Sequence, residues 1–347
     1  MPERSIGSRS QRRARRRTVR TATAIAAAVL AAGSALLSTG TTTAQAAGGF
    51  GTFAPYVDLS LYPQYDLASS AATEGTKYFN LAFITDGGSC TPKWAGVTDL
   101  TDSATVADIA ALRSAGGDVR VSFGGASGNE LAAGCSSAAD LAAAYQKVID
   151  QYSLTYIDFD VEGGALTDTA SVDRRNQAIA ILEQNNPSLQ VSYTLPVLPT
   201  GLTSDGVNVL TSAKTNNATI AAVNVMAMDY GSSFPADMAQ NAIDAATATQ
   251  GQVKSVWTDL TDDQAWSKIA VTPMIGVNDD SAETFTVANA STLVSFAQSK
   301  HLAWLSFWSA TRDQPCPGGA QDSASATCSS IDQTAGDFGK AMSAYTG

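Results

Sequence analysis

The chain has 347 residues, of which 21 are basic and 32 are acidic, and its net charge of −11 argues against a surface that binds nucleic acid or anionic membranes. Eight of the basic residues lie in the first 46, so residues 47–347 carry 13 basic and 31 acidic side chains, a net charge of −18. Such a surface suits a neutral or cationic polymer as substrate, although acidity that only keeps a protein soluble explains it at least as well.

The amino-terminal segment has the pattern of a signal peptide. The arginine-rich run RRARRR from Arg12 is followed by the small apolar stretch TATAIAAAVLAAGSALL, and Ala44-Gln45-Ala46 has the small-x-small form of a signal-peptidase site. We predict a signal peptide over residues 1–46, cleaved after Ala46, with the Sec and twin-arginine routes both open. Other apolar runs are shorter than the roughly 20 residues that cross a bilayer, so we expect a secreted, extracellular protein.

Short β-branched or aromatic runs alternate with alanine-rich amphipathic stretches through residues 47–347. Eight alternating strands and helices predict an α/β fold of the (β/α)8 TIM barrel type, in one domain. A doubly wound sheet is the alternative, but no G-x-G-x-x-G pattern follows the first strand. The predicted strands are FAPYVD from Phe53, YFNLAFI from Tyr78, VRVSFGG from Val119, YIDFDVE from Tyr156, LQVSYTL from Leu189, IAAVNVMAMDY from Ile220, IAVTPMIG from Ile269 and LAWLSFWS from Leu302.

Five helices are predicted between these strands. They are ATVADIAALRSA from Ala104, LAAAYQKVID from Leu141, ASVDRRNQAIAILEQ from Ala170, PADMAQNAIDAATATQ from Pro235 and NASTLVSFAQSK from Asn289.

Four cysteines fit two disulfides in an oxidising compartment. The most local pairing joins Cys90 to Cys135 and Cys316 to Cys328. Because there is no C-x-x-C and His301 is the only histidine, we expect no metal site and no cofactor.

The run YSLTYIDFDVEG from Tyr152 places three carboxylates at alternate positions: Asp158, Asp160 and Glu162. Alternate residues of a strand point to one face, so these three acids, the acid row, line one side with neighbouring Cα atoms about 6.6 Å apart. Their titrations are then coupled, and desolvation with like charge raises at least one pKa. A Glu with a raised pKa is a general acid near neutral pH.

Two other interpretations of the acid row are weaker. An edge strand can carry acids for solubility, but helix-like stretches precede and follow this strand. A calcium loop needs a bidentate Glu at its twelfth position, where this chain has Thr169.

Further candidate residues end other predicted strands, where a barrel carries its functional groups. Gly124 and Gly125 close the third strand, although a glycine turn alone explains them. Asp229 and Tyr230 end the sixth strand, where they also suit a structural hydrogen-bonded pair. Trp308 ends the eighth, as a core side chain or as a platform for a sugar ring.

The motifs VSFGG, YIDFDVE, VMAMDYG and LSFWSATRD resemble glycoside hydrolase family 18, the chitinases and related endo-β-N-acetylglucosaminidases. The family pattern D-x-x-D-x-D-x-E appears with its last three members, while Thr155 and Val161 stand where the family often has Asp and Trp. In the sixth-strand pattern M-x-Y-D, Met228 replaces the usual Tyr, and Tyr230 is the candidate to supply that hydroxyl.

The resemblance implies a retaining mechanism in which the substrate's own N-acetyl oxygen is the nucleophile. Glu162 would be the general acid and then the base, Asp160 would hold the acetamido N–H, and Asp158 would tune Asp160 by sharing a proton. Tyr230 or Asp229 would orient the acetamido group. The implied substrate-binding residues are Asp229, Trp308, Met228, Tyr193, Gly124 and Gly125.

The expected substrate is chitin or another N-acetylglucosamine-containing polysaccharide, bound by a monomer without nucleic acid or membrane partners. Two alternatives stay open: an endo-β-N-acetylglucosaminidase acting on N-glycans, and a barrel that binds chitin without catalysis. The intact Glu162 argues against the second of these.

Overall fold

The computed structural model describes residues 50–234 and 237–347, and within these ranges the main sheet has eight parallel strands along its path. They are β1 (Tyr56–Asp58), β2 (Tyr78–Asp86), β4 (Asp118–Gly124), β5 (Tyr156–Asp160), β6 (Gln190–Leu198), β8 (Ala222–Ala227), β9 (Ile269–Pro273) and β12 (Trp304–Leu305). They pair in the order β1-β2-β4-β5-β6-β8-β9-β12. Every one falls on a strand predicted from the sequence, so those predictions are confirmed.

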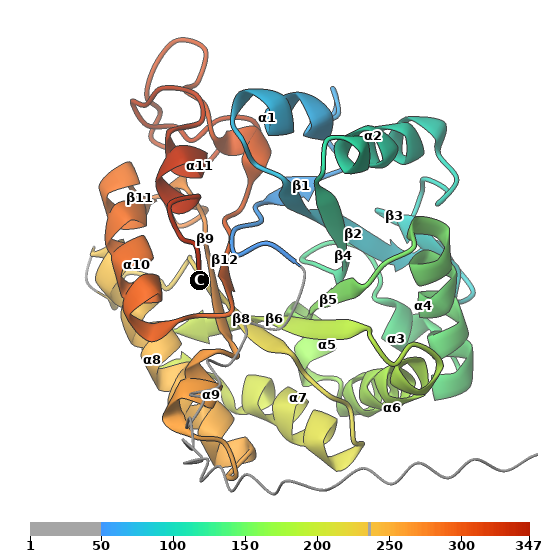
Figure 1. The fold of residues 1–347 in the computed structure, drawn as a ribbon. Coiled ribbons are helices and arrows are strands. Elements are labelled where there is room, and N and C mark those ends of the chain that lie inside the picture. The colour runs from blue at the N-terminus through green and yellow to red at the C-terminus, as the bar shows by residue number, and fades with distance from the viewer. Residues whose placement is uncertain (1–49, 235–236) are drawn as a thin grey trace, which may run out of the picture. The chain divides into compact units, whose positions relative to one another are not determined.

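The first and last strands of this sheet meet. Phe53 forms a parallel bridge with Leu305. The backbone N–H groups of Ala54 and Tyr56 donate to the carbonyl oxygens of Leu305 and Phe307, each over 3.0 Å. The sheet therefore closes on itself as the predicted (β/α)8 barrel, and Figure 1 shows the helices arranged around the strands.

The five predicted helices are all present, and among the described residues six further helices join them, of which α7 is as long as the predicted α2. The helix predicted from Pro235 begins at Met238, where the Asp237 side chain accepts from the Gln240 N–H, while residues 235 and 236 lie outside the described residues. The helices are α1 (Leu67–Thr73), α2 (Ser103–Ser114), α3 (Leu131–Gly134), α4 (Ala138–Tyr152), α5 (Gly163–Thr167), α6 (Thr169–Asn185), α7 (Ser204–Thr215), α8 (Met238–Val256), α9 (Asp262–Trp266), α10 (Val287–Lys300) and α11 (Asp337–Met342), with the 3-10 turn η1 (Ala310–Arg312).

Four short strands were not predicted: β3 (Pro92–Trp94), β7 (Gly201–Leu202), β10 (Gly276–Val277) and β11 (Thr284–Phe285). They pair antiparallel, β3 with β2, β7 with β6, and β10 with β11. Each follows the carboxyl end of a barrel strand, so these hairpins extend the rim on which a barrel places its site.

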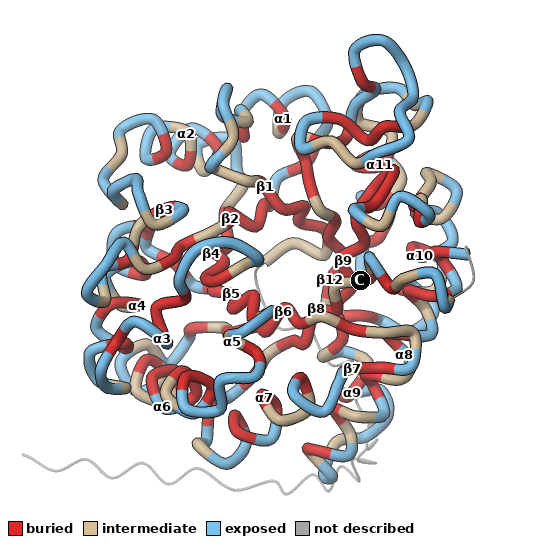
Figure 2. Tube along the Cα trace, turned by 180° about the vertical axis from the view of Figure 1, so that it is seen from behind, coloured by how far each residue is buried: buried red, intermediate tan, exposed pale blue. Residues whose placement is uncertain are grey.

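The two faces of β5 differ as the alternating sequence predicts. Phe159 is fully buried and packs outward on Tyr145 of α4, with ring centroids 4.9 Å apart. Asp158 and Asp160 point inward, where they are also buried. Figure 2 shows that buried residues follow the strands and the inward helix faces, so the apolar layer between sheet and helices holds β5 in this orientation.

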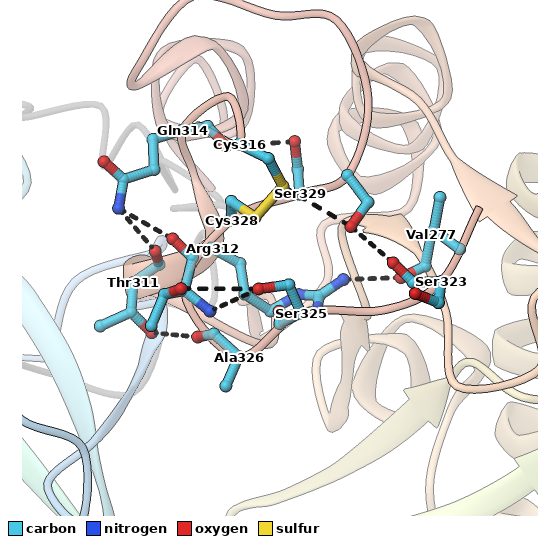
Figure 3. The surroundings of a disulfide bond; sticks show 12 residues. Val277, Thr311, Arg312, Gln314, Cys316, Ser323, Ser325, Ala326, Cys328 and Ser329 are labelled. Atoms are coloured by element: carbon cyan, nitrogen blue, oxygen red, sulfur yellow. Dashed lines mark hydrogen bonds between the residues drawn. A yellow bond between two sulfur atoms is a disulfide. The ribbon is translucent and has the colours of Figure 1, made fainter. Parts of the chain in front are cut away.

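Both predicted disulfides are confirmed. Cys90 joins Cys135, and Cys316 joins Cys328 across a separation of 12 residues. Figure 3 shows the loop closed by the second disulfide, with Arg312 beneath it. The Arg312 guanidinium donates to the carbonyl oxygen of Ser325 in this loop and to those of Ile275 and Val277 at 2.8 and 2.7 Å, which ties the loop to the β10 hairpin.

None of the helices in the described part of the chain is long and apolar enough to cross a membrane. The predicted signal peptide, residues 1–46, lies outside the described residues.

Candidate active site

Asp158 lies at the centre of the barrel and is fully buried. Its carboxylate accepts from the hydroxyl groups of Ser122 on β4 (2.7 Å), of Ser192 (2.5 Å) and Thr194 (2.9 and 3.0 Å) on β6, and of Tyr56 on β1 (3.0 Å). A carboxylate has about four lone-pair positions, so these donors saturate Asp158. The strand register explains the two serines, because Ser122 and Ser192 both pair with Asp158.

Asp160 and Glu162 form the reactive half of the acid row. Burial raises the pKa of Asp160 well above its ordinary value, and the nearby charges of Glu162 and Asp158 raise it further. Burial also raises the pKa of Glu162, which is partly offset by its hydrogen bond with Asp160. Both shifts favour a proton on this pair of carboxyls, and the two titrations are coupled.

The hydrogen-bond partners of Asp158 differ from those expected from the sequence. Sequence analysis expected Asp158 to share a proton with Asp160, but the oxygens of Asp158 are occupied by hydroxyl donors. Asp160 interacts instead with Glu162, and its Oδ1 atom has no hydrogen-bond partner among the described residues. Asp160 is therefore free to accept a hydrogen bond from a bound molecule.

An aromatic cluster of Tyr56, Phe83 and Trp308 lies beside the acid row. Trp308 stacks on Phe83 with ring centroids 5.7 Å apart and an interplanar angle of 13°, and Tyr56 is tilted against Trp308 at 6.1 Å. Tyr56 also joins the cluster to Asp158 through its hydroxyl. Trp308 is only partly buried, so the cluster offers a surface on which a sugar ring can stack.

Sequence reasoning missed Tyr56 and Phe83. Simple alternation does not bring Phe83 to Trp308, because the β2–β4 register shifts between Leu81 and Ile84. A β-bulge of this kind redirects a side chain, and the sequence YFNLAFI gives no local signal for it. Tyr56 could have been found as an inward position of the first strand, next to the predicted acid row.

Neighbouring atoms approach the backbone at positions 124 and 125 so closely that only glycine fits there. Gly124 has a φ of +101°, and a Cβ there would lie 2.1 Å from the carbonyl oxygen of Asp160. Gly125 has a φ of +86°, and a Cβ there would lie 2.5 Å from the ring of Phe83. The glycine pair therefore lets the third barrel strand pass directly beside the acid row and the aromatic cluster.

We expect Gly125→Ala to displace Phe83, because the new methyl group overlaps the ring and the backbone conformation is left-handed. The free energy of unfolding should fall by about 1–3 kcal/mol, and KM should rise because the stacking surface is disturbed. Chemical denaturation and steady-state kinetics measure the two effects.

Gly251→Ala on α8 is the matched control, because a Cβ there meets no atom within 4 Å. It should leave KM unchanged and stabilise the helix by roughly 0.5–1 kcal/mol. A Gly125→Ala enzyme with normal KM and normal stability would show that Phe83 accommodates the methyl group.

A pocket of about 250 Å³ opens beside Asp160 and Glu162, between the loops that follow β4 and β5. Glu130 lines it and forms a buried ion pair with Arg175 of α6, so this acid is already neutralised. The lining residues are Gly124, Gly125, Ala126, Ser127, Gly128, Asn129, Glu130, Ala133, Asp160, Glu162, Gly163, Gly164, Ala165 and Asp168.

The residues that end the sixth barrel strand point in different directions. Asp229 is exposed, has a φ of +51°, and accepts from the Asp280 N–H at 2.7 Å. Tyr230 is buried against Phe234, with ring centroids 6.2 Å apart, and burial together with the charge of Glu283 raises its pKa. These contacts do not bring Tyr230 to the acid row, and partly buried Met228 precedes them at the strand end.

Tyr193 lies on the outer face of the fifth barrel strand. It is fully buried, and its hydroxyl donates to Asn176 Oδ1 of α6 at 2.6 Å. The alternation that points Ser192 and Thr194 inward turns Tyr193 toward the helices, so the structure does not bring it to the acid row.

The geometry supports proton transfer at Glu162 and charge stabilisation at Asp160, next to an aromatic surface. Glu162 stands at the start of α5, and its side chain makes no capping hydrogen bond there. The Glu162 carboxyl is therefore not used to cap its own helix, and it lines the pocket beside Asp160.

Two named proteins are similar to this chain over 76% of its length. A probable bifunctional chitinase/lysozyme of Escherichia coli strain K12 is 38% identical over 277 residues, and endochitinase 11 of Metarhizium anisopliae is 36% identical over 275. The matches cover 31% and 52% of those proteins, so the chain spans a third to a half of the length of these relatives.

Active domain 2 of the thermostable chitinase from Pyrococcus furiosus, solved as catalytic-site mutants complexed with chito-oligosaccharides, has a similar structure. It is 35% identical with a TM-score of 0.79, and the alignment covers 87% of this chain and 97% of that chain. No protein-family model matches the chain.

Proposed function

The chain belongs to glycoside hydrolase family 18, the family of the chitinases, and on that premise we propose that it hydrolyses the β-1,4 bonds of N-acetylglucosamine polymers such as chitin. The observation that carries the proposal is that Asp160 and Glu162 line one pocket beside the aromatic cluster. The chito-oligosaccharides bound by the Pyrococcus furiosus domain support the same substrate class.

In the first step Glu162 donates its proton to the glycosidic oxygen while the acetamido oxygen of the same sugar attacks C1. The bond from C1 to the leaving oxygen breaks, and a cyclic oxazolinium ion forms. Asp160 accepts the acetamido N–H with its unpartnered oxygen and stabilises the positive charge. The raised pKa of Glu162 favours the protonated acid at higher pH than in a free Glu side chain.

In the second step the Glu162 carboxylate takes a proton from water, which attacks C1 and opens the oxazolinium ring. Two displacements at C1 retain its configuration. Asp158 holds its negative charge next to Asp160 and so favours the proton on the reactive pair. Trp308 and Phe83 support the sugar ring during both steps.

The proposal also covers the export of the protein and its domain organisation. Residues 1–46 act as the signal peptide and residues 47–347 as the catalytic domain of a secreted, extracellular monomer. Two disulfides support an oxidising compartment, and the surplus of acidic residues supports an uncharged polymer rather than nucleic acid as the partner.

The test uses purified residues 47–347 with colloidal chitin and, in parallel, a high-mannose glycoprotein, and products are identified by mass spectrometry. We expect short N-acetylglucosamine oligomers from chitin. Release of intact glycans from the glycoprotein without chitin turnover would move the assignment to an endo-β-N-acetylglucosaminidase. Binding to chitin without any product would contradict catalysis.

A further inference from the structure

Arg120 is a fully buried cation inside the barrel, on the same strand as Ser122 and one inward position before it. Its guanidinium lies against three aromatic faces, which we call the aromatic cage. The distances from its Cζ to the ring centroids are 4.0 Å for Tyr156, 4.1 Å for Trp304 and 4.4 Å for Phe50. The cage desolvates the cation while its ring faces still attract the charge.

The guanidinium makes no hydrogen bond to the described protein groups through Nε, Nη1 or Nη2. A buried arginine normally has a carboxylate partner, as Arg175 has in Glu130. Burial lowers the pKa of Arg120, while Tyr156, Asp158 and Tyr56 act in the opposite direction. Arginine remains protonated even so, and the interior therefore holds an unpaired positive charge.

Asp158 is the inward-facing acid in the next layer of the barrel above Arg120, level with Ser122. Burying a carboxylate there is costly, and hydroxyl donors alone offset only part of that cost. The titratable and charged groups facing Asp158 are Tyr56 from β1, Arg120 from β4, and Tyr156 and Asp160 from β5, with Glu162 and Glu130 acting on Asp160.

We propose that Arg120 is a positioning residue whose buried charge acts on Asp158 without touching it, and so sets the protonation of the Asp160–Glu162 pair. The proposal rests on the proposed function, because it assigns Arg120 a part in that reaction. Charges interact over several ångströms in a low-dielectric interior, so a direct salt bridge is not required.

The experiment compares Arg120→Met with Arg120→Lys, since the two side chains have similar length and differ in charge. The pH dependence of kcat/KM is measured on an N-acetylglucosamine oligomer. Loss of the cation makes protonation of the carboxylates easier, so the acidic limb of R120M should move toward neutral pH by on the order of one unit. The acidic limb of R120K should stay at the wild-type position.

Two controls separate charge from packing. Phe50→Leu removes one ring of the aromatic cage but keeps the cation, so it should lower Tm and leave the acidic limb in place. In an Asp158→Asn background, Arg120→Met should shift the limb much less, because the anion on which Arg120 acts is gone. A full shift in that background would overturn the proposed route through Asp158.

Unfolding measured against pH gives a readout that needs no turnover. The stability gap between R120M and R120K should widen as the pH rises, because only R120M leaves the Asp158 anion without a countercharge. If R120M does not fold while R120K does, the charge itself is required, as proposed. If both fold with the same pH profile and the same gap at every pH, Arg120 only fills space.

The proposed function and the role of Arg120 can be refuted separately. A wild-type protein without hydrolysis overturns the proposed function, and the unfolding data then still test the Arg120–Asp158 coupling. A wild-type enzyme that hydrolyses the oligomer, with R120M and R120K indistinguishable in both assays, overturns the role of Arg120 alone.

Discussion

Replacing Glu162 by glutamine is expected to lower kcat by roughly 10²- to 10⁴-fold, the usual loss when a positioned general acid is removed. The amide keeps the shape of the side chain but cannot deliver a proton to the glycosidic oxygen. KM should change little, because Trp308 and Asp160 still bind the sugar. Single-turnover kinetics on an N-acetylglucosamine oligomer measures the chemical step directly.

Asp168→Asn is the matched control for this variant. Asp168 lines the same pocket, but its carboxylate accepts from the N–H groups of Ala170 and Ser171 at the start of α6. Asparagine also caps helices, so this variant should turn over like the wild type. Wild-type turnover by Glu162→Gln would remove Glu162 from its role as the acid.

Replacing Asp160 by asparagine is expected to reduce kcat nearly as much, by about 10²–10³-fold, because the oxazolinium ion loses its negative partner. The same variant should be more stable than the wild type at pH 8. Burial and the charges of Glu162 and Asp158 raise the pKa of Asp160 in the folded state. The unfolded chain therefore gives up this proton more readily than the folded one.

The direction of the pKa shift determines the pH range in which the Asp160 carboxylate destabilises the fold. Below the ordinary value of 3.8 Asp160 is protonated in both states and imposes no electrostatic penalty. The penalty grows as the pH rises from there to the raised folded-state pKa, and above that it is complete. Asp160→Asn should thus raise Tm by on the order of a few degrees at pH 8 and by little near pH 4. A lower Tm at pH 8 would mean that the carboxylate stabilises the fold.

The barrel could be predicted from the sequence because its strands and helices have clear periods. The acid row was predictable for the same reason: alternation along YIDFDVE puts Asp158 and Asp160 on one face whatever surrounds them. Choosing the most local cysteine pairing also predicted both disulfides, although Cys90 and Cys135 are 45 residues apart. The strand and helix periods and the acid row depend on residues that are near each other along the chain.

Features that depend on contacts between distant strands were not predictable. Phe83 reaches Trp308 through a register shift in β2, and Arg120 enters a cage built from Phe50, Tyr156 and Trp304. The expectation for Tyr230 rested on its being two residues after Met228, but the turn after β8 directs it toward Phe234. Residues two positions apart point to the same face only while the strand continues.

Proton NMR of the anomeric signals during hydrolysis of an N-acetylglucosamine oligomer tests the central claim most directly. Attack by the acetamido oxygen, followed by water at the same carbon, predicts that the new reducing end appears first as the β-anomer. The α-anomer should then grow only at the rate of spontaneous mutarotation. Appearance of the α-anomer first would mean that water attacks C1 in a single displacement, and the roles given to Asp160 and Glu162 would be wrong.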